Sequence, residues 1–122
     1  MKNAEDHEKA IARLRTSKEQ GLKDLRQQGK DAGVDFASND AEYLDLERLA
    51  RWRDKNGDIF PQVLSQTSFT EIAALMANEM EPDGDSADWA RERWGDDINQ
   101  PEWVEAFVLA ALAKYNELKG KL

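Results

Sequence analysis

The sequence predicts an all-α fold, a single-domain irregular or orthogonal bundle of about five helices with a long N-terminal helix. Apolar residues recur at the three- and four-residue spacing of amphipathic helices, and no segment alternates with period two for long enough to form a strand. Capping residues and glycine stops divide the chain into helix-length segments. The 122 residues suffice for one domain with its own core, and the chain contains no cysteine that could cross-link it.

The first expected helix spans about residues 5–37 and carries only a thin apolar stripe. Three glycines lie on or beside that stripe, and each weakens a helix by about 1 kcal/mol relative to alanine. Positions 1–35 contain six large apolar residues, whereas positions 36–122 contain 27. We therefore expect two parts: a long charged helix over 1–37 that packs or oligomerises, and a compact helical domain over 38–122.

The second expected helix covers about residues 41–55. Ser38, Asn39 and Asp40 supply side chains that can cap its start, and Tyr43 is expected on its inner face. Asn56-Gly57 provides the left-handed exit of a helix end, and a short helical turn follows with a proline near its start.

The remaining helices have clearer signals. Ser68 and Glu71 form a capping box that opens a helix ending near residue 80. An acidic turn follows, in which Asp85 or Ser86 is expected to cap a short helix over 87–94 that stops at Gly95. The last helix begins with a proline in its first turn and has the strongest amphipathic stripe of the chain.

The stretch RDKNGDIF, residues 53–60, resembles the start of a calcium-binding loop because Asp54, Asn56 and Asp58 have the required spacing. Such a loop needs glycine at its sixth position and a bidentate glutamate at its twelfth. Those positions hold Ile59 and Ser65. We therefore interpret the stretch as a helix stop and expect no metal.

Catalytic patterns are lacking in the sequence. The single histidine, His7, excludes zinc motifs and di-iron bundles that need two, and it lacks the context of a serine triad. No phosphate-binding glycine loop is present, and nothing selects a catalytic pair from the 25 carboxylates. We expect a protein that is not an enzyme and uses no cofactor.

The net charge of −8 argues against direct binding to nucleic acid or to anionic membranes, and no apolar run is long enough to span a bilayer. The absence of cysteine fits a reducing compartment, so we expect a cytoplasmic protein. Most of the imbalance comes from residues 79–97, with eight acidic and two basic side chains. A surface of this kind favours a basic protein partner.

Four tryptophans are present, and most are expected to be partly buried in the core. Trp89 and Trp94 are five residues apart on one short helix, so we expect one of them to stay exposed beside the acidic cluster. An exposed tryptophan there would suit a protein-binding hot spot. The expected partner-binding residues are Glu79, Glu81, Asp83, Asp85, Asp88, Trp89, Glu92, Asp96 and Asp97.

The function that we favour from the sequence is a small acidic protein that binds another protein as an inhibitor, antitoxin-like regulator or adaptor. One alternative is a DNA-binding regulator with a helix-turn-helix near 67–94, although its turn is long and its second helix is acidic. A second alternative is a small helical enzyme or metal protein.

The long first helix also predicts self-association. Its apolar face is too narrow to hold it in water without tertiary packing. Leu14, Leu25 and Phe36 recur every eleven residues, which keeps them on one face. The glycines of the first helix also let another helix approach closely, so the first helix can pack on a second copy of the chain, on the functional partner or on the C-terminal helix. We prefer the homodimer, with a seam formed by Leu14, Leu22, Leu25, Gly29 and Phe36.

Overall fold

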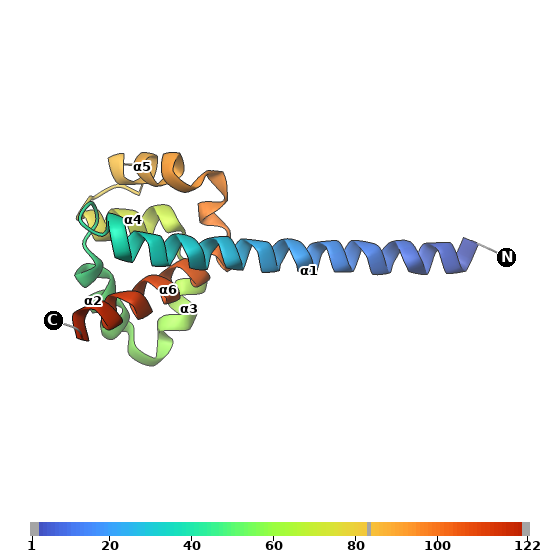
Figure 1. Cartoon of the computed structure of the whole chain (residues 1–122), viewed down its shortest axis with the longest axis horizontal. Coiled ribbons are helices and arrows are strands. Elements are labelled where there is room, and N and C mark those ends of the chain that lie inside the picture. The colour runs from blue at the N-terminus through green and yellow to red at the C-terminus, as the bar shows by residue number, and fades with distance from the viewer. Residues whose placement is uncertain (1–2, 83, 121–122) are drawn as a thin grey trace.

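The computed structural model describes the backbone of residues 3–82 and 84–120, and the side chains of those ranges from residue 18 onward. It confirms the all-α bundle, and the described residues contain no strand. A π-helical turn follows the first helix, and two short 3-10 turns lie further along (Figure 1). The helices are α1 (Asn3–Asp35), η1 (Phe36–Asp40), α2 (Leu46–Asn56), η2 (Gly57–Ile59), α3 (Phe60–Ser65), α4 (Phe69–Ala77), α5 (Asp85–Trp94), η3 (Asp96–Asn99) and α6 (Pro101–Gly120).

The central contact of the fold is the close packing of α1 on α6, which run side by side in the same direction (Figure 1). A Cβ atom built on Gly29 would lie 3.1 Å from the Trp103 Cα and collide with the Trp103 carbonyl oxygen. A Cβ on Gly33 would collide in the same way with the Phe107 carbonyl oxygen. The two glycines are therefore needed because the two backbones touch at this crossing.

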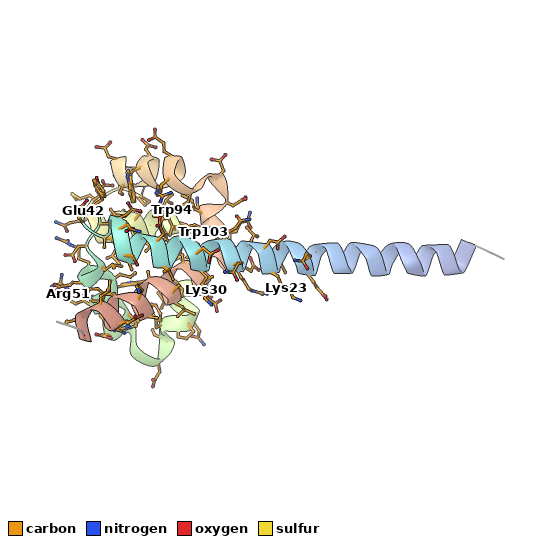
Figure 2. All side chains as sticks on the ribbon, viewed as in Figure 1. Lys23, Lys30, Glu42, Arg51, Trp94 and Trp103 are labelled. Atoms are coloured by element: carbon orange, nitrogen blue, oxygen red, sulfur yellow. The ribbon has the colours of Figure 1, made fainter. Side chains whose placement is uncertain are left out.

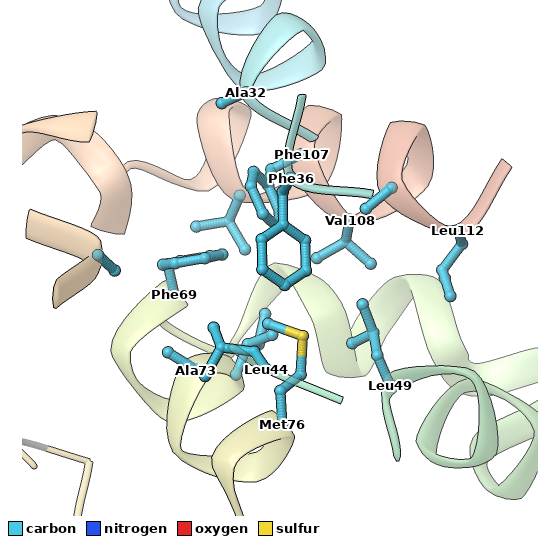
Figure 3. Close-up of a cluster of buried hydrophobic side chains, with 14 of the residues drawn as sticks. Ala32, Phe36, Leu44, Leu49, Phe69, Ala73, Met76, Phe107, Val108 and Leu112 are labelled. Atoms are coloured by element: carbon cyan, nitrogen blue, oxygen red, sulfur yellow. The ribbon is translucent and has the colours of Figure 1, made fainter. Parts of the chain in front are cut away.

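The core lies beneath this crossing and draws side chains from every part of the bundle (Figure 3). Phe36, Phe69 and Phe107 have no exposed surface, and the Phe69 and Phe107 rings meet edge to face with centroids 4.6 Å apart. Ala32, Phe36 and Ala37 all belong to this core, so the core crosses the division expected at residues 37 and 38. The last third of α1 is an integral part of the compact domain.

The first half of α1 has a different setting, because it extends well beyond the bundle with no other element beside it (Figure 1). Its first described residue is Asn3, and the helix continues without a break to Asp35. The long N-terminal helix that the sequence predicts is therefore present, and only its C-terminal part packs on the domain.

The start of the second helix differs from the expectation. Residues 38–40 belong to the π-helical turn η1, and α2 begins at Leu46. Asp45 is its N-cap, with a side-chain oxygen that accepts a hydrogen bond from the Glu47 N–H at 2.8 Å. Tyr43, expected on an inner face, lies in the linker and is 63% exposed. This later start buries Leu44 and Leu46 together, which a helix over 41–55 would not do as well.

Several other helix ends agree with their local signals, although α4 ends at Ala77 and not near residue 80, and α5 begins at Asp85 and not at Ala87. Ser68 and Glu71 form both hydrogen bonds of the capping box. Gly57 and Gly95 close α2 and α5 with positive φ angles of 53° and 94°. Pro61 lies in the first turn of α3. These ends form as expected because each depends on residues within a few positions of it.

No helix in the part of the chain that the structure describes combines the length and apolarity needed to cross a membrane.

Candidate functional site

The linker before α5 contains one expected partner-binding residue that is used inside the protein. The Glu79 carboxylate accepts hydrogen bonds from the Ser86 N–H at 3.1 Å and from the Ser86 hydroxyl at 2.8 Å. Gly84 is the N-cap of α5 and offers no side chain, so Glu79 supplies the missing acceptor. Neither Asp85 nor Ser86 is the N-cap of α5, contrary to the expectation. Because Glu79 bonds within the chain, we no longer include it in the candidate binding surface.

The other acidic residues of this region point to solvent from α5, η3 and the linker. Asp83 lies outside the described residues. The exposed carboxylates belong to Glu81, Asp85, Asp88, Glu92, Asp96 and Asp97. We call these six residues, together with Trp89, the α5 face.

The two arginines of α5 pair in different directions. Arg93 forms ion pairs with Asp35 at the end of α1 and with Asp40 of η1, the latter at 3.5 Å. Arg91 lies 3.5 Å from the Asp88 carboxylate on the same helix. Because Arg93 is directed to Asp35 and Asp40, its charge fastens α5 to the bundle.

The tryptophans of α5 differ from the expectation that one would stay exposed. Both are partly buried, and both contact Phe36, with ring centroids 6.3 Å away for Trp89 and 5.9 Å for Trp94. The two indoles also meet each other edge to face at 5.3 Å. A tryptophan is large enough to reach the core from the side of a helix, so both residues pack there.

Exposed apolar side chains adjoin the α5 face. Tyr43 packs on Trp89 with ring centroids 5.7 Å apart, although the tyrosine itself is 63% exposed. Met80, in the linker that leads to α5, is completely exposed. The described part of this region therefore combines negative charge with a largely exposed tyrosine and a fully exposed methionine, which are features of protein-binding surfaces.

The five residues expected in a self-association seam have different positions. Gly29 and Phe36 are buried within the chain, against Trp103 and in the core, so neither is available to a second copy. Leu25 and Leu22 are both partly buried, and of the two only Leu25 packs against the core cluster. The side chain of Leu14 lies outside the described residues.

A groove follows one side of the α1–α6 pair. Its volume is about 630 Å³, and Lys23, Arg26 and Lys30 of α1 form one wall (Figure 2). Glu102 and Glu105 of α6 form the other wall. The floor is apolar and consists of Ala106, Leu109 and Ala110. Leu109 is 50% exposed, so the floor of the groove offers apolar surface to solvent.

Chemistry beyond binding finds little support in these surroundings. Among the residues that the structure describes, no group of three or more acidic or histidine side chains is placed to hold a metal ion. Burial and the neighbouring Glu47 carboxylate, which accepts its hydrogen bond, raise the pKa of the Tyr115 hydroxyl. That shift makes Tyr115 a weaker acid and does not create a catalytic base.

Comparison of the chain with protein-family models, with curated proteins and with solved structures finds no match. The functional argument therefore depends on this chain's own residues and their placement.

Proposed function

We propose that the protein is not an enzyme and acts by binding another protein, as an inhibitor, an antitoxin-like regulator or an adaptor. The α5 face is the surface that docks, and the partner presents a basic surface to it. A nucleic-acid-binding protein is one class of partner with such a surface, because it must already attract phosphates. The lack of cysteine agrees with a reducing, cytoplasmic setting for this function.

One observation carries the proposal: α5 presents exposed carboxylates, its Trp89 packs on the 63% exposed Tyr43, and the cation of Arg93 is directed to α1. Negative charge spread over a surface raises the rate of association with a basic partner and makes it dependent on salt. The apolar surface of Tyr43 and Trp89 supplies the kind of anchor on which interface affinity depends. Charge and anchor together suit a protein partner better than a small molecule.

The same geometry weighs against the DNA-binding alternative. A helix-turn-helix over 67–94 would use α5 as its recognition helix, and such a helix presents basic side chains to the DNA. Arg93 is engaged with Asp35 and Asp40, and Asp85, Asp88 and Glu92 face solvent. Phosphates would be repelled from this helix.

The test compares two double variants that remove the same charge. Asp85→Asn with Glu92→Gln changes the α5 face, and Asp54→Asn with Asp58→Asn changes exposed carboxylates at the end of α2 and in η2. Each protein is immobilised and exposed to source-cell lysate at low and high salt, and bound proteins are identified by mass spectrometry. A partner of the α5 face is retained by the wild type and by the α2 control, and is lost from the α5 variant and at high salt.

A partner retained equally by all three proteins at every salt concentration would contradict this docking surface. A gel-shift assay of the wild-type protein with duplex DNA at low salt tests the DNA-binding alternative. A shift seen with the wild type would favour that alternative instead.

A further inference from the structure

Two rows of apolar positions run along α1 at eleven-residue spacing. One row contains positions 11, 22 and 33, and the other contains positions 14, 25 and 36. Eleven residues are close to three full turns of an α-helix, so the positions in a row share one face. Gly33 and Phe36, at the C-terminal ends of the rows, are buried against α6 and the core. The face that α6 covers therefore continues, as sequence pattern, into the projecting half of α1.

Toward the N-terminus of α1, packing by α6 ends before the two rows of positions end. The α6 helix begins at Pro101, and its Trp103 touches the α1 backbone at Gly29. Leu25 packs against the core cluster, whereas Leu22, which is also partly buried, is not part of that cluster. Figure 1 shows that no other element lies beside α1 further toward its N-terminus.

A lone helix of this composition has little stability in water. Nucleation is costly, and helices in proteins depend mainly on packing of an apolar face. Gly21 lies in the projecting region with no neighbour within 4 Å, so it weakens the helix there and no close approach within the chain compensates. The continuous helix from Asn3 therefore calls for a second surface that covers Ile11, Leu14 and Leu22.

We propose that this cover is a second copy of the chain, in a two-fold dimer in which the two α1 helices run antiparallel. A two-fold axis near Lys18 places Leu14 of one copy opposite Leu22 of the other, and Ile11 opposite Leu25. Each row of one copy then meets the other row of its partner copy. Because α6 occupies the same face beyond Gly29, the N-terminal end of the second α1 must pass to the side of α6.

The groove beside α6 is the space available for that end. Its floor carries the half-exposed Leu109, and its α1 wall carries Lys23, Arg26 and Lys30 (Figure 2). In the antiparallel register, residues 5–8 of the second copy lie level with residues 28–31, beside Lys30. That segment reads Glu5-Asp6-His7-Glu8 and is followed by Lys9. Its acidic residues complement the lysines and arginine of one wall, and Lys9 complements the glutamates of the other.

The proposed dimer contact does not use the α5 face. No residue of α5 lines the groove, and Figure 1 shows α5 and α3 on opposite sides of α1. The dimer can therefore form whether or not the proposed function is correct.

Cross-linking tests the direction of the pairing. The wild-type chain has no cysteine, so single cysteines introduced by Leu14→Cys and Leu22→Cys are the sole thiols. A short bis-maleimide reagent is added to each variant alone and to an equal mixture of the two. The antiparallel dimer predicts strong cross-linking in the mixture between the two different chains, and little in either variant alone. Cross-linking of the Leu14→Cys variant with itself would overturn the antiparallel register.

Sedimentation over a range of concentrations tests the surfaces. We expect Leu22→Asp and Leu109→Asp each to raise the dimer dissociation constant at least about tenfold. Leu118→Asp is the matched control, because Leu118 is a similarly exposed leucine of α6, 37% exposed, outside the groove. It should leave the dissociation constant unchanged, and circular dichroism should show that all three variants are folded.

A charge exchange tests the acidic end in the groove. Lys30→Glu should weaken the dimer severalfold, and adding Asp6→Lys to it should restore most of the loss. A wild-type protein that stays monomeric at the highest attainable concentration would overturn the proposal. So would a dimer that is indifferent to the Leu22, Leu109 and Lys30 substitutions.

Discussion

The helix from Asn3 to Phe36 consists of a projecting half, residues 3–22, and a covered half, residues 23–36, which share one repeating apolar pattern yet have opposite surroundings. The covered half touches the backbone of α6 at Gly29 and Gly33 and ends in the core at Phe36, the first residue of η1. The projecting half extends past the bundle. Local sequence accounts for the helix in both halves, whereas its stability depends on what covers it. Substitutions that remove packing contacts should therefore change the free energy of unfolding much more in the covered half than in the projecting half.

The largest contrast should come from truncating an apolar side chain in each half. Phe36→Ala empties a fully buried site and should lower the free energy of unfolding by about 3–5 kcal/mol. Leu22→Ala, measured at a concentration too low for association, should lower it by less than about 1 kcal/mol because Leu22 is only partly buried and lies outside the core cluster. Urea denaturation checks both values, and equal losses would show that the projecting half is covered within the chain.

Replacing one glycine in each half by alanine should change the free energy of unfolding in opposite directions. Gly33→Ala forces a Cβ into the Phe107 backbone and should lower the free energy of unfolding by about 1–3 kcal/mol. Gly21→Ala meets nothing within 4 Å and should raise helix stability by about 0.5–1 kcal/mol. Thermal unfolding of the two variants and the wild type decides the matter. Two shifts in the same direction would contradict the tight α1–α6 crossing.

A smaller effect should come from the ion pairs that fasten α5 to the covered half. Arg93→Gln removes the contacts with Asp35 and Asp40 and should cost up to about 1 kcal/mol at low salt, decreasing as salt rises, because these groups are partly exposed. Lys114→Gln, which loses only an i,i+3 pair on α6, is the control and should cost less. If the two costs match at all salt concentrations, Arg93 does not tie α5 to α1.

The smallest expected effect on stability comes from Tyr115, which lies toward the end of α6, away from the α1–α6 crossing. The raised pKa of Tyr115 means that the folded state favours the protonated hydroxyl. The stability it contributes should be complete below the ordinary value of 10.0 and should decline as pH rises through the folded-state pKa. Tyr115→Phe should remove this decline. Unfolding measured at neutral and strongly alkaline pH tests it, with ultraviolet absorbance reporting ionisation of the hydroxyl.

Residues that act locally made much of the fold predictable. The capping box of Ser68 and Glu71, the stops at Gly57 and Gly95, and the stripe of α6 each depend on neighbours within a turn or two. The start of α2 was mispredicted because residues 38–40 and Asp45 are all good caps, and burial of Leu44 and Leu46 decides between them.

The candidate site was predicted less completely because its details are non-local. Glu79 caps a helix seven residues ahead, which no spacing rule anticipates. Arg93 pairs with Asp35 and Asp40, which lie 58 and 53 positions earlier in the chain. Only the tertiary structure reveals that its charge is directed to these two residues. The glycines of α1 did indicate a close helix contact. Their partner proved to be α6 of the same chain.

The parallel course of α1 and α6 also bears on when the chain can fold. Two parallel helices require a long connection, and here everything from η1 to η3 lies between them. Closing so long a connection carries a large entropic cost before the crossing repays it. The backbone contacts at Gly29 and Gly33 cannot form until Trp103 and Phe107, much later in the sequence, have been synthesised. During translation α1 therefore remains without its packing partner until α6 has left the ribosome.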